Sequence, residues 1–117
     1  MKKTFKEYED FTETTARYDR SDSLREAAYL TLGLTSEAGE VADKLKKFIR
    51  DQKGKDIEQM SEDQKKEIAK ELGDVLWYTA RLSIRFGSSL EEVANKNIEK
   101  LQSRKDRSKL HGSGDNR

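Results

Sequence analysis

Apolar residues recur at three- and four-residue spacing through most of the chain, which is the period of a helix with one buried face. The two longest runs are Leu34, Ala38, Val41, Leu45 and Phe48, followed by Ile68, Leu72, Val75, Thr79, Leu82 and Phe86. No segment alternates apolar and polar residues in the way that a half-buried strand does. The pattern therefore predicts an all-α protein.

Capping residues indicate where the helices begin and end. A Ser or Thr followed three residues later by Glu or Gln forms a capping box, which satisfies backbone N–H groups at a helix N-terminus. This pattern begins at Thr4, Ser23, Ser61 and Ser89. Gly54 and Gly87 suit helix C-termini because glycine accepts the left-handed backbone conformation there. Together these signals predict four helices, at residues 5–18, 24–52, 62–86 and 90–105.

The length and composition of the chain indicate one domain with a thin core. We assign the domain to residues 1–107, followed by a polar, Gly-rich and flexible tail at 108–117. Only 32% of the 117 residues are hydrophobic and 40% are charged, which is little core material for a monomer. We therefore expect part of the apolar surface to be buried against another subunit.

Charge and residue usage exclude several classes of function. The net charge of +1 gives no general attraction to nucleic acid or membrane, so neither is expected as a partner. The absence of cysteine excludes disulfides and thiolate-bound zinc, and the single histidine, His111, excludes the Glu-x-x-His pairs of carboxylate di-iron bundles. No segment resembles a secretory signal or approaches the roughly twenty apolar residues of a membrane helix, so we expect a cytoplasmic protein.

Two pairs of acidic residues lie on the two longest predicted helices. Glu37 and Glu40 are three residues apart on the first, and Glu71 and Asp74 are three apart on the second. Residues three apart share one helix face, so each helix presents two carboxylates to one side. If the helices pack side by side, four carboxylates can meet, which is costly unless a cation neutralises them. A divalent cation with oxygen ligands, beside a phosphorylated substrate, is the natural occupant.

The surroundings of the acids favour a ligand cleft. On each helix the two acids lie at the border of the apolar face, where side chains are half-buried. Gly39 and Gly73 each lie just before the second acid of a pair. Glycine destabilises a helix interior by about 1 kcal/mol relative to alanine, so its use twice suggests close approach of another helix. A solvated helix face remains the alternative, because a chain with 23 acidic residues contains such pairs by chance.

These residues resemble the motifs of the MazG-like, all-α nucleoside triphosphate pyrophosphohydrolases. That family carries Glu-Glu-x-x-Glu on one helix and Glu-x-x-Asp on the next. The chain reads Ser36-Glu37-Ala38-Gly39-Glu40 and then Glu71-Leu72-Gly73-Asp74. Ser36 stands where the family has its leading Glu, and the other four acids match. The similarity covers roughly residues 24–104.

The resemblance implies an oligomeric four-helix bundle that works as a homodimer or homotetramer. It implies hydrolysis of (deoxy)nucleoside triphosphates between the α- and β-phosphates, to monophosphate and pyrophosphate, as clean-up of the nucleotide pool. The implied cofactor is Mg²⁺, with Mn²⁺ as a substitute. The implied metal ligands and catalytic residues are Glu37, Glu40, Glu71 and Asp74. One of these carboxylates could instead orient or deprotonate the attacking water.

Five further residues are candidate substrate contacts. Lys44 and Lys47 could meet phosphate oxygens, although a basic helix end also complements the helix dipole. By the resemblance, Tyr78 faces the nucleotide, and Asn97 and Lys100 on the last helix contact sugar or phosphate. Packing at the edge of the apolar face is the alternative for the tyrosine, and a solvated face is the alternative for the last two.

The single tryptophan, Trp77, could stack on a base. On the helical wheel, however, it lies away from the acids, so we expect it at a subunit contact instead.

Two other functions remain open. A phosphoribosyl-ATP pyrophosphohydrolase would share the fold, and substrate competition would separate the two enzymes. A non-catalytic helical interaction module, whose acids only keep its surface soluble, would respond little to Mg²⁺.

Overall fold

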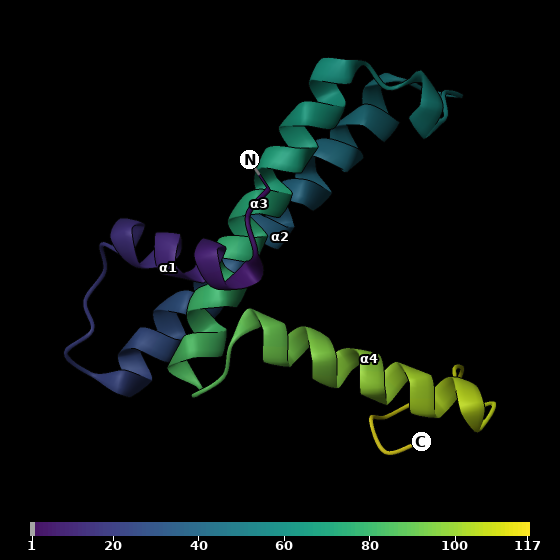
Figure 1. Cartoon of the computed structure of the whole chain (residues 1–117). Coiled ribbons are helices and arrows are strands. Elements are labelled where there is room, and N and C mark those ends of the chain that lie inside the picture. The colour runs from purple at the N-terminus through teal and green to yellow at the C-terminus, as the bar shows by residue number, and fades with distance from the viewer. Residues whose placement is uncertain (1) are drawn as a thin grey trace.

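The computed structural model describes residues 2–117, and this part of the chain contains helices and no strand. The elements are α1 (Phe5–Thr15), α2 (Ser23–Asp51), a short 3₁₀ turn η1 (Ile57–Gln59), α3 (Glu62–Arg85) and α4 (Leu90–Asp106). Figure 1 shows α2 and α3 as a long antiparallel pair, with α1 lying across it and α4 projecting from its end. The predicted all-α class and the four helices are confirmed.

Local capping chemistry explains the helix starts. Thr4 and Ser61 form the predicted capping boxes, and the Ser89 side chain accepts a backbone N–H at the start of α4. The prediction for Ser23 is wrong, because the carboxylate of Asp22 caps α2 and Ser23 is already helical. An aspartate satisfies the free N–H groups of a first helical turn as well as serine does, and its charge also suits the helix dipole.

The core lies mainly between α2 and α3. Leu30 on α2 and Ala80 on α3 are fully buried, and Phe48 and Met60 close the far end of the pair. Met60 follows η1 and is buried, so it anchors a connection whose other apolar side chain, Ile57, is exposed. Gly54 and Gly87 follow α2 and α3 with φ of 78° and 72°, as a glycine-terminated helix requires.

Helix α1 connects the α2–α3 pair to α4. Its Glu13 carboxylate lies 2.7 Å from the buried Arg81 guanidinium of α3. Its buried Glu9 accepts a hydrogen bond from the Leu90 N–H in the first turn of α4. In the described part of the chain α4 contacts α1 and α3 but not α2. One subunit therefore does not close into a four-helix bundle.

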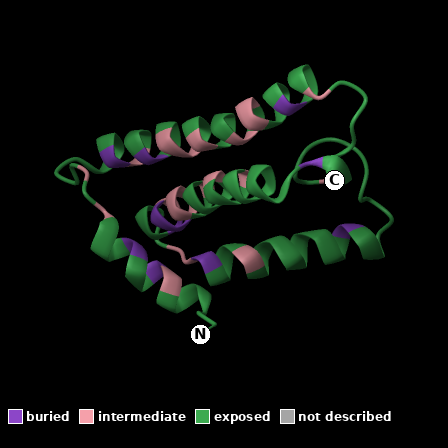
Figure 2. Cartoon of the chain, turned by 90° about the horizontal axis from the view of Figure 1, so that it is seen from above, coloured by how far each residue is buried: buried purple, intermediate pink, exposed green. Residues whose placement is uncertain are grey.

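Most positions of the chain are exposed, as Figure 2 shows, and many of them carry large apolar side chains. The radius of gyration is 17.4 Å, whereas about 13 Å is usual for a compact domain of this length. The accessible surface is 8904 Å², whereas about 6,500 Å² is usual for a folded monomer of this mass. Among residues 2–117, sixteen large apolar side chains are exposed, including Leu32, Ile49, Leu72, Phe86 and Ile98. The thin core expected from the composition is thus present.

Beyond α4 the chain turns back on itself without forming a helix. The guanidinium of Arg104, which is buried, lies 3.0 Å from the carboxylate of Asp115 in the tail, and Lys100 lies 3.4 Å from the same carboxylate. The mobility of residues 108–117 stays a prediction. Within residues 2–117, none of the helices combines the length and apolar character needed to cross a membrane.

Candidate active site

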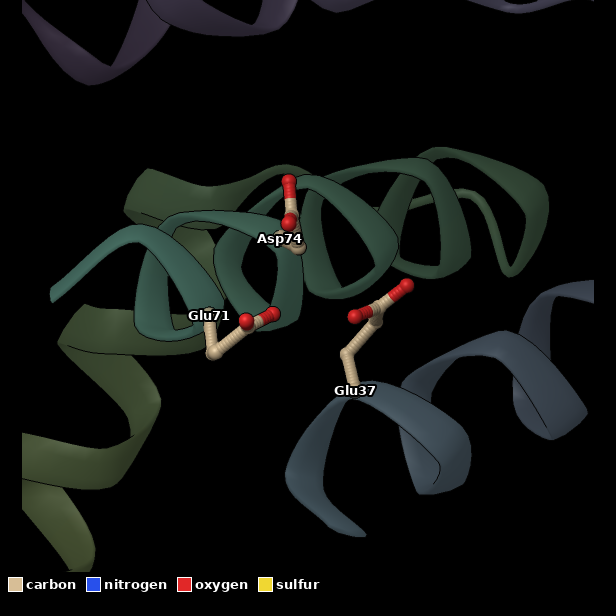
Figure 3. A group of neighbouring side chains, drawn as sticks. All are labelled: Glu37, Glu71 and Asp74. Atoms are coloured by element: carbon tan, nitrogen blue, oxygen red, sulfur yellow. The ribbon is translucent and has the colours of Figure 1, made fainter. Parts of the chain in front are cut away.

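Three of the four predicted acids meet between α2 and α3. Figure 3 shows Glu37 on α2 facing Glu71 and Asp74 on α3, and one oxygen of each carboxylate lies within 4.8 Å of the others. The spacing of three residues puts Glu71 and Asp74 on one face of α3, and the antiparallel packing brings Glu37 opposite that face. Among residues 2–117 this is the group of acids with metal-binding geometry.

The cluster is electrostatically crowded. The pKa of Glu37 is raised above its ordinary value, first by desolvation and then by the negative charges of Asp74, Glu71 and Glu40. Glu40 itself is exposed and lies outside the group of three, although its charge acts on Glu37. Like charges held together in this way favour binding of a cation.

Lys44 already supplies one positive charge. Its ammonium nitrogen lies 3.2 Å from Oε1 of Glu71, with both side chains less than one-third exposed. The structure therefore brings this predicted substrate contact to the acid cluster, where it neutralises one carboxylate.

The chemistry of the cluster fits a hard divalent cation. All three donors are carboxylate oxygens, the ligands that Mg²⁺ and Mn²⁺ prefer. Two ligands on opposite sides of Mg²⁺ are about 4.1 Å apart, so donors within 4.8 Å need only a small inward movement. Glu37, Glu71 and Asp74 could hold the ion without any change of backbone.

Beside the acids lies a cavity of about 500 Å³ with an aromatic wall. It is lined by Phe11, Thr15, Arg17, Tyr18, Tyr29, Glu37, Asp74, Trp77 and Tyr78. The rings of Tyr18 and Tyr29 are stacked with centroids 5.2 Å apart, and Trp77 meets Tyr18 edge-on at 6.2 Å. A volume of this size is within the range of small-molecule sites, and flat rings offer a stacking surface for a planar ligand.

Tyr78 lines the cavity together with the aromatic wall and the acids, and its contact with a nucleotide stays a prediction. Its ring packs directly on the backbone of Gly33, where an added Cβ would lie 2.1 Å from Cε1. Its pKa is raised, chiefly by desolvation and then by the neighbouring Tyr29, with smaller effects of Glu37 and Asp74. Helices α2 and α3 therefore approach each other closely at Gly33.

The predicted role of Gly39 and Gly73 does not hold within one chain. A Cβ at either position would meet no atom of the described residues within 4 Å. No helix of the same subunit approaches there, so the geometry of one chain gives no reason for glycine at these two positions.

The prediction that Trp77 lies away from the acids is wrong, whereas its position at a subunit contact stays a prediction. Trp77 lines the same cavity as Asp74, and its indole N–H donates to Oγ1 of Thr15 at 2.7 Å. Asp74 is three residues earlier on α3, so the two residues share one side of the helix. The contact with Thr15 joins residues 62 positions apart, so only the tertiary packing of α1 on α3 reveals it.

The remaining predicted substrate contacts are not brought to the cavity. Lys47 pairs with Asp43 on its own helix. Asn97 is exposed on α4, and Lys100 pairs with Asp115. Asn97 and Lys100 do not line the aromatic cavity, because α4 projects away from the α2–α3 pair (Figure 1).

The fold and the site define an all-α protein with a carboxylate cluster suited to a divalent cation beside an aromatic cavity. The model of the MazG nucleotide pyrophosphohydrolase domain matches residues 25–108, and the chain therefore belongs to the MazG family. This family is metal-dependent in general, acts on nucleotides as a pyrophosphohydrolase, and is the family that the two acidic motifs indicated.

One similar protein is the "Gene 37 protein" of Mycobacterium phage L5. It is 45% identical over 96 residues, which cover 82% of this chain and 81% of the relative. No solved structure matches the chain.

Proposed function

We propose that the protein is a Mg²⁺-dependent nucleoside triphosphate pyrophosphohydrolase. It cleaves (d)NTP between the α- and β-phosphates, releases (d)NMP and pyrophosphate, and thereby removes unwanted triphosphates from the nucleotide pool. The observation that carries this proposal is the joint lining of one cavity by Glu37, Asp74 and a wall of aromatic rings. A nucleoside triphosphate joins a metal-binding phosphate chain to a flat base, and the cavity offers a suitable surface to each part.

The acids would hold the metal. Glu37, Glu71 and Asp74 supply three oxygen donors, and Glu40, whose charge already acts on Glu37, is the fourth candidate. When bound, Mg²⁺ neutralises phosphate charge and stabilises the leaving pyrophosphate. A carboxylate not engaged by the ion would orient the attacking water or accept its proton.

The other groups in the site would position the substrate. Lys44 is paired with Glu71, and a cation on that carboxylate would leave the ammonium free to contact a phosphate oxygen. The stacked rings of Tyr18 and Tyr29 and the neighbouring Trp77 would bind the base and keep water from the nucleoside end. Tyr78 would contact the sugar between the two. Such positioning supplies much of the acceleration in phosphoryl chemistry, so no covalent nucleophile is needed.

The working unit would be a homodimer or homotetramer that completes a helical bundle. The chain exposes roughly 2,400 Å² more surface than a compact monomer of its mass. This is about what one subunit contributes to a large obligate interface. Asn97, Lys100 and Lys47, which lie outside the cavity of their own chain, would approach the substrate only in such an assembly. Light scattering that gives a monomer mass at micromolar concentration would refute this part of the proposal.

Product analysis tests the reaction. The protein is incubated with Mg²⁺ and a panel of ribo- and deoxynucleoside triphosphates, and the products are separated by ion exchange. The proposal predicts monophosphate and pyrophosphate, with turnover abolished in Asp74→Ala. Glu67→Gln is the matched control, because Glu67 lies one turn before Glu71 on α3 but pairs with Lys70 outside the cluster. Diphosphate and phosphate as products, or undiminished activity in Asp74→Ala, would refute the proposal.

A further inference from the structure

The aromatic cavity contains one positively charged residue, Arg17. Its charged lining consists of this arginine and the carboxylates of Glu37 and Asp74. Arg17 comes from the connection between α1 and α2, whereas the two acids come from α2 and α3. The cavity thus combines a cation from one segment with anions from two others, around a volume of about 500 Å³.

The backbone on both sides of Arg17 is held in place. On one side, Arg20 donates a hydrogen bond to the carbonyl of Ala16 at 3.3 Å, and its guanidinium also pairs with Glu13. On the other side, the Tyr18 hydroxyl donates to Glu26 at 3.1 Å, and its ring stacks on Tyr29. The position of Arg17 at the rim is therefore fixed by its neighbours and not by its own side chain.

The side chain of Arg17 is itself uncommitted. Within residues 2–117 it makes no ion pair and no hydrogen bond, and it is exposed to the cavity and solvent. The lysines singled out by the sequence are different, because Lys44, Lys47 and Lys100 are each paired with an acid of the same chain. The guanidinium of Arg17, in the lining of the cavity and without a partner among residues 2–117, is free to bind an incoming anion.

The charge of the substrate complex favours such a group. Three carboxylates, one divalent cation and an ionised triphosphate together carry a large net negative charge, and Lys44 reduces it by only one unit, so a second cation in the cavity would favour binding. Arginine suits this role because its planar fork binds two phosphate oxygens at once and stays charged at any working pH. Resting on the function proposed above, we propose that Arg17 is a substrate contact that binds the phosphate chain in the cavity that Glu37 and Asp74 also line.

Substitution at Arg17, with a matched control, tests the inference. Arg17→Gln removes the charge, Arg17→Lys keeps the charge without the fork, and Arg25→Gln removes an exposed arginine that lies outside the cavity. One measurement is kcat/KM for the preferred nucleoside triphosphate. The second is calorimetric binding of inorganic tripolyphosphate with Mg²⁺ and, separately, of the nucleoside without phosphates. Melting curves check that all three variants fold.

The expected result is a loss of about 10- to 100-fold in both kcat/KM and tripolyphosphate affinity for Arg17→Gln, as for a lost hydrogen-bonded charge contact. Arg17→Lys should recover part of this loss, while Arg25→Gln and nucleoside binding should stay within twofold of the wild type. An Arg17→Gln protein equal to the control overturns the inference, and so does a loss that falls on the nucleoside alone. If the wild type hydrolyses no triphosphate, the proposed function fails, but tripolyphosphate binding still decides the role of Arg17.

Discussion

Replacement of Gly33 by alanine should disrupt the packing that holds Tyr78 beside the acids. The added Cβ would lie 2.1 Å from Cε1, 2.4 Å from Cζ and 2.7 Å from Cδ1 of the Tyr78 ring. Carbon atoms in contact are normally 3.5–4.0 Å apart, so the ring has to move by roughly 1.5 Å. A rigid ring cannot do this by a small rotation, because three of its atoms face the new methyl group.

The magnitude follows from what the ring would lose. Its edge-on contact with Trp77, with centroids 5.0 Å apart, contributes about 0.5–1.5 kcal/mol. Residual overpacking adds about 1 kcal/mol or more. The better helix propensity of alanine offsets about 1 kcal/mol. The free energy of unfolding should therefore fall by about 1 kcal/mol or more.

Gly39→Ala and Gly73→Ala are matched controls on the same two helices. A Cβ at either site meets no described atom within 4 Å, so alanine should leave the free energy of unfolding unchanged or raise it by up to about 1 kcal/mol. Urea denaturation followed by the fluorescence of the single tryptophan, at one fixed protein concentration, measures all three. A Gly33→Ala protein as stable as the controls would refute the packing described here. Destabilisation in the controls would instead show that another subunit packs on these glycines.

Three further predictions concern the metal, pH and helix capping. Mg²⁺ at a hundred times its Kd should raise the free energy of unfolding of the wild type by about 2.7 kcal/mol. In Glu37→Gln this gain should vanish, while the stability of the metal-free variant should equal that of the metal-free wild type or be slightly higher. Melting curves that show the same Mg²⁺ response in both proteins would contradict the site. The pKa of Glu13 is lowered by hydrogen bonds from Arg20 and then Arg81, so its stabilising effect should be present above the ordinary value of 4.5 and be lost as the pH falls through the lower folded value. The stability difference between wild type and Glu13→Gln should accordingly shrink between pH 7 and pH 3, and a constant difference would count against this ion pair. Ser61→Ala removes the capping box of α3 and should cost about 1 kcal/mol in urea denaturation, and no loss would mean that the cap is not formed.

The helices could be predicted closely because their signals are local. Caps and apolar spacing located α3 and α4 to within a residue at each end. The error was largest at α1, which ends at Thr15 and not at residue 18. There Tyr18 hydrogen-bonds to Glu26 and stacks on Tyr29, so tertiary contacts draw the chain out of the helix.

The site could be predicted only in part, because tertiary packing decides which side chains meet there. The spacing of Glu71 and Asp74 fixes their common face, but which acid of α2 faces them depends on how the two helices pack. The packing turns Glu37 into the cluster and leaves Glu40 exposed. The aromatic wall and Arg17 carried no motif, because they are assembled from α1, α2 and α3 by contacts between distant parts of the chain.

The proposed reaction is tested most directly by a ³¹P NMR time course of nucleoside triphosphate hydrolysis with Mg²⁺, comparing the wild type with Glu71→Gln. We expect monophosphate and pyrophosphate to form in equimolar amounts in the wild type, so that the pyrophosphate resonance, which comes from two phosphorus atoms, grows about twice as fast as that of the monophosphate; neither should grow with Glu71→Gln. Resonances of nucleoside diphosphate and inorganic phosphate, or full activity without the Glu71 carboxylate, would contradict it.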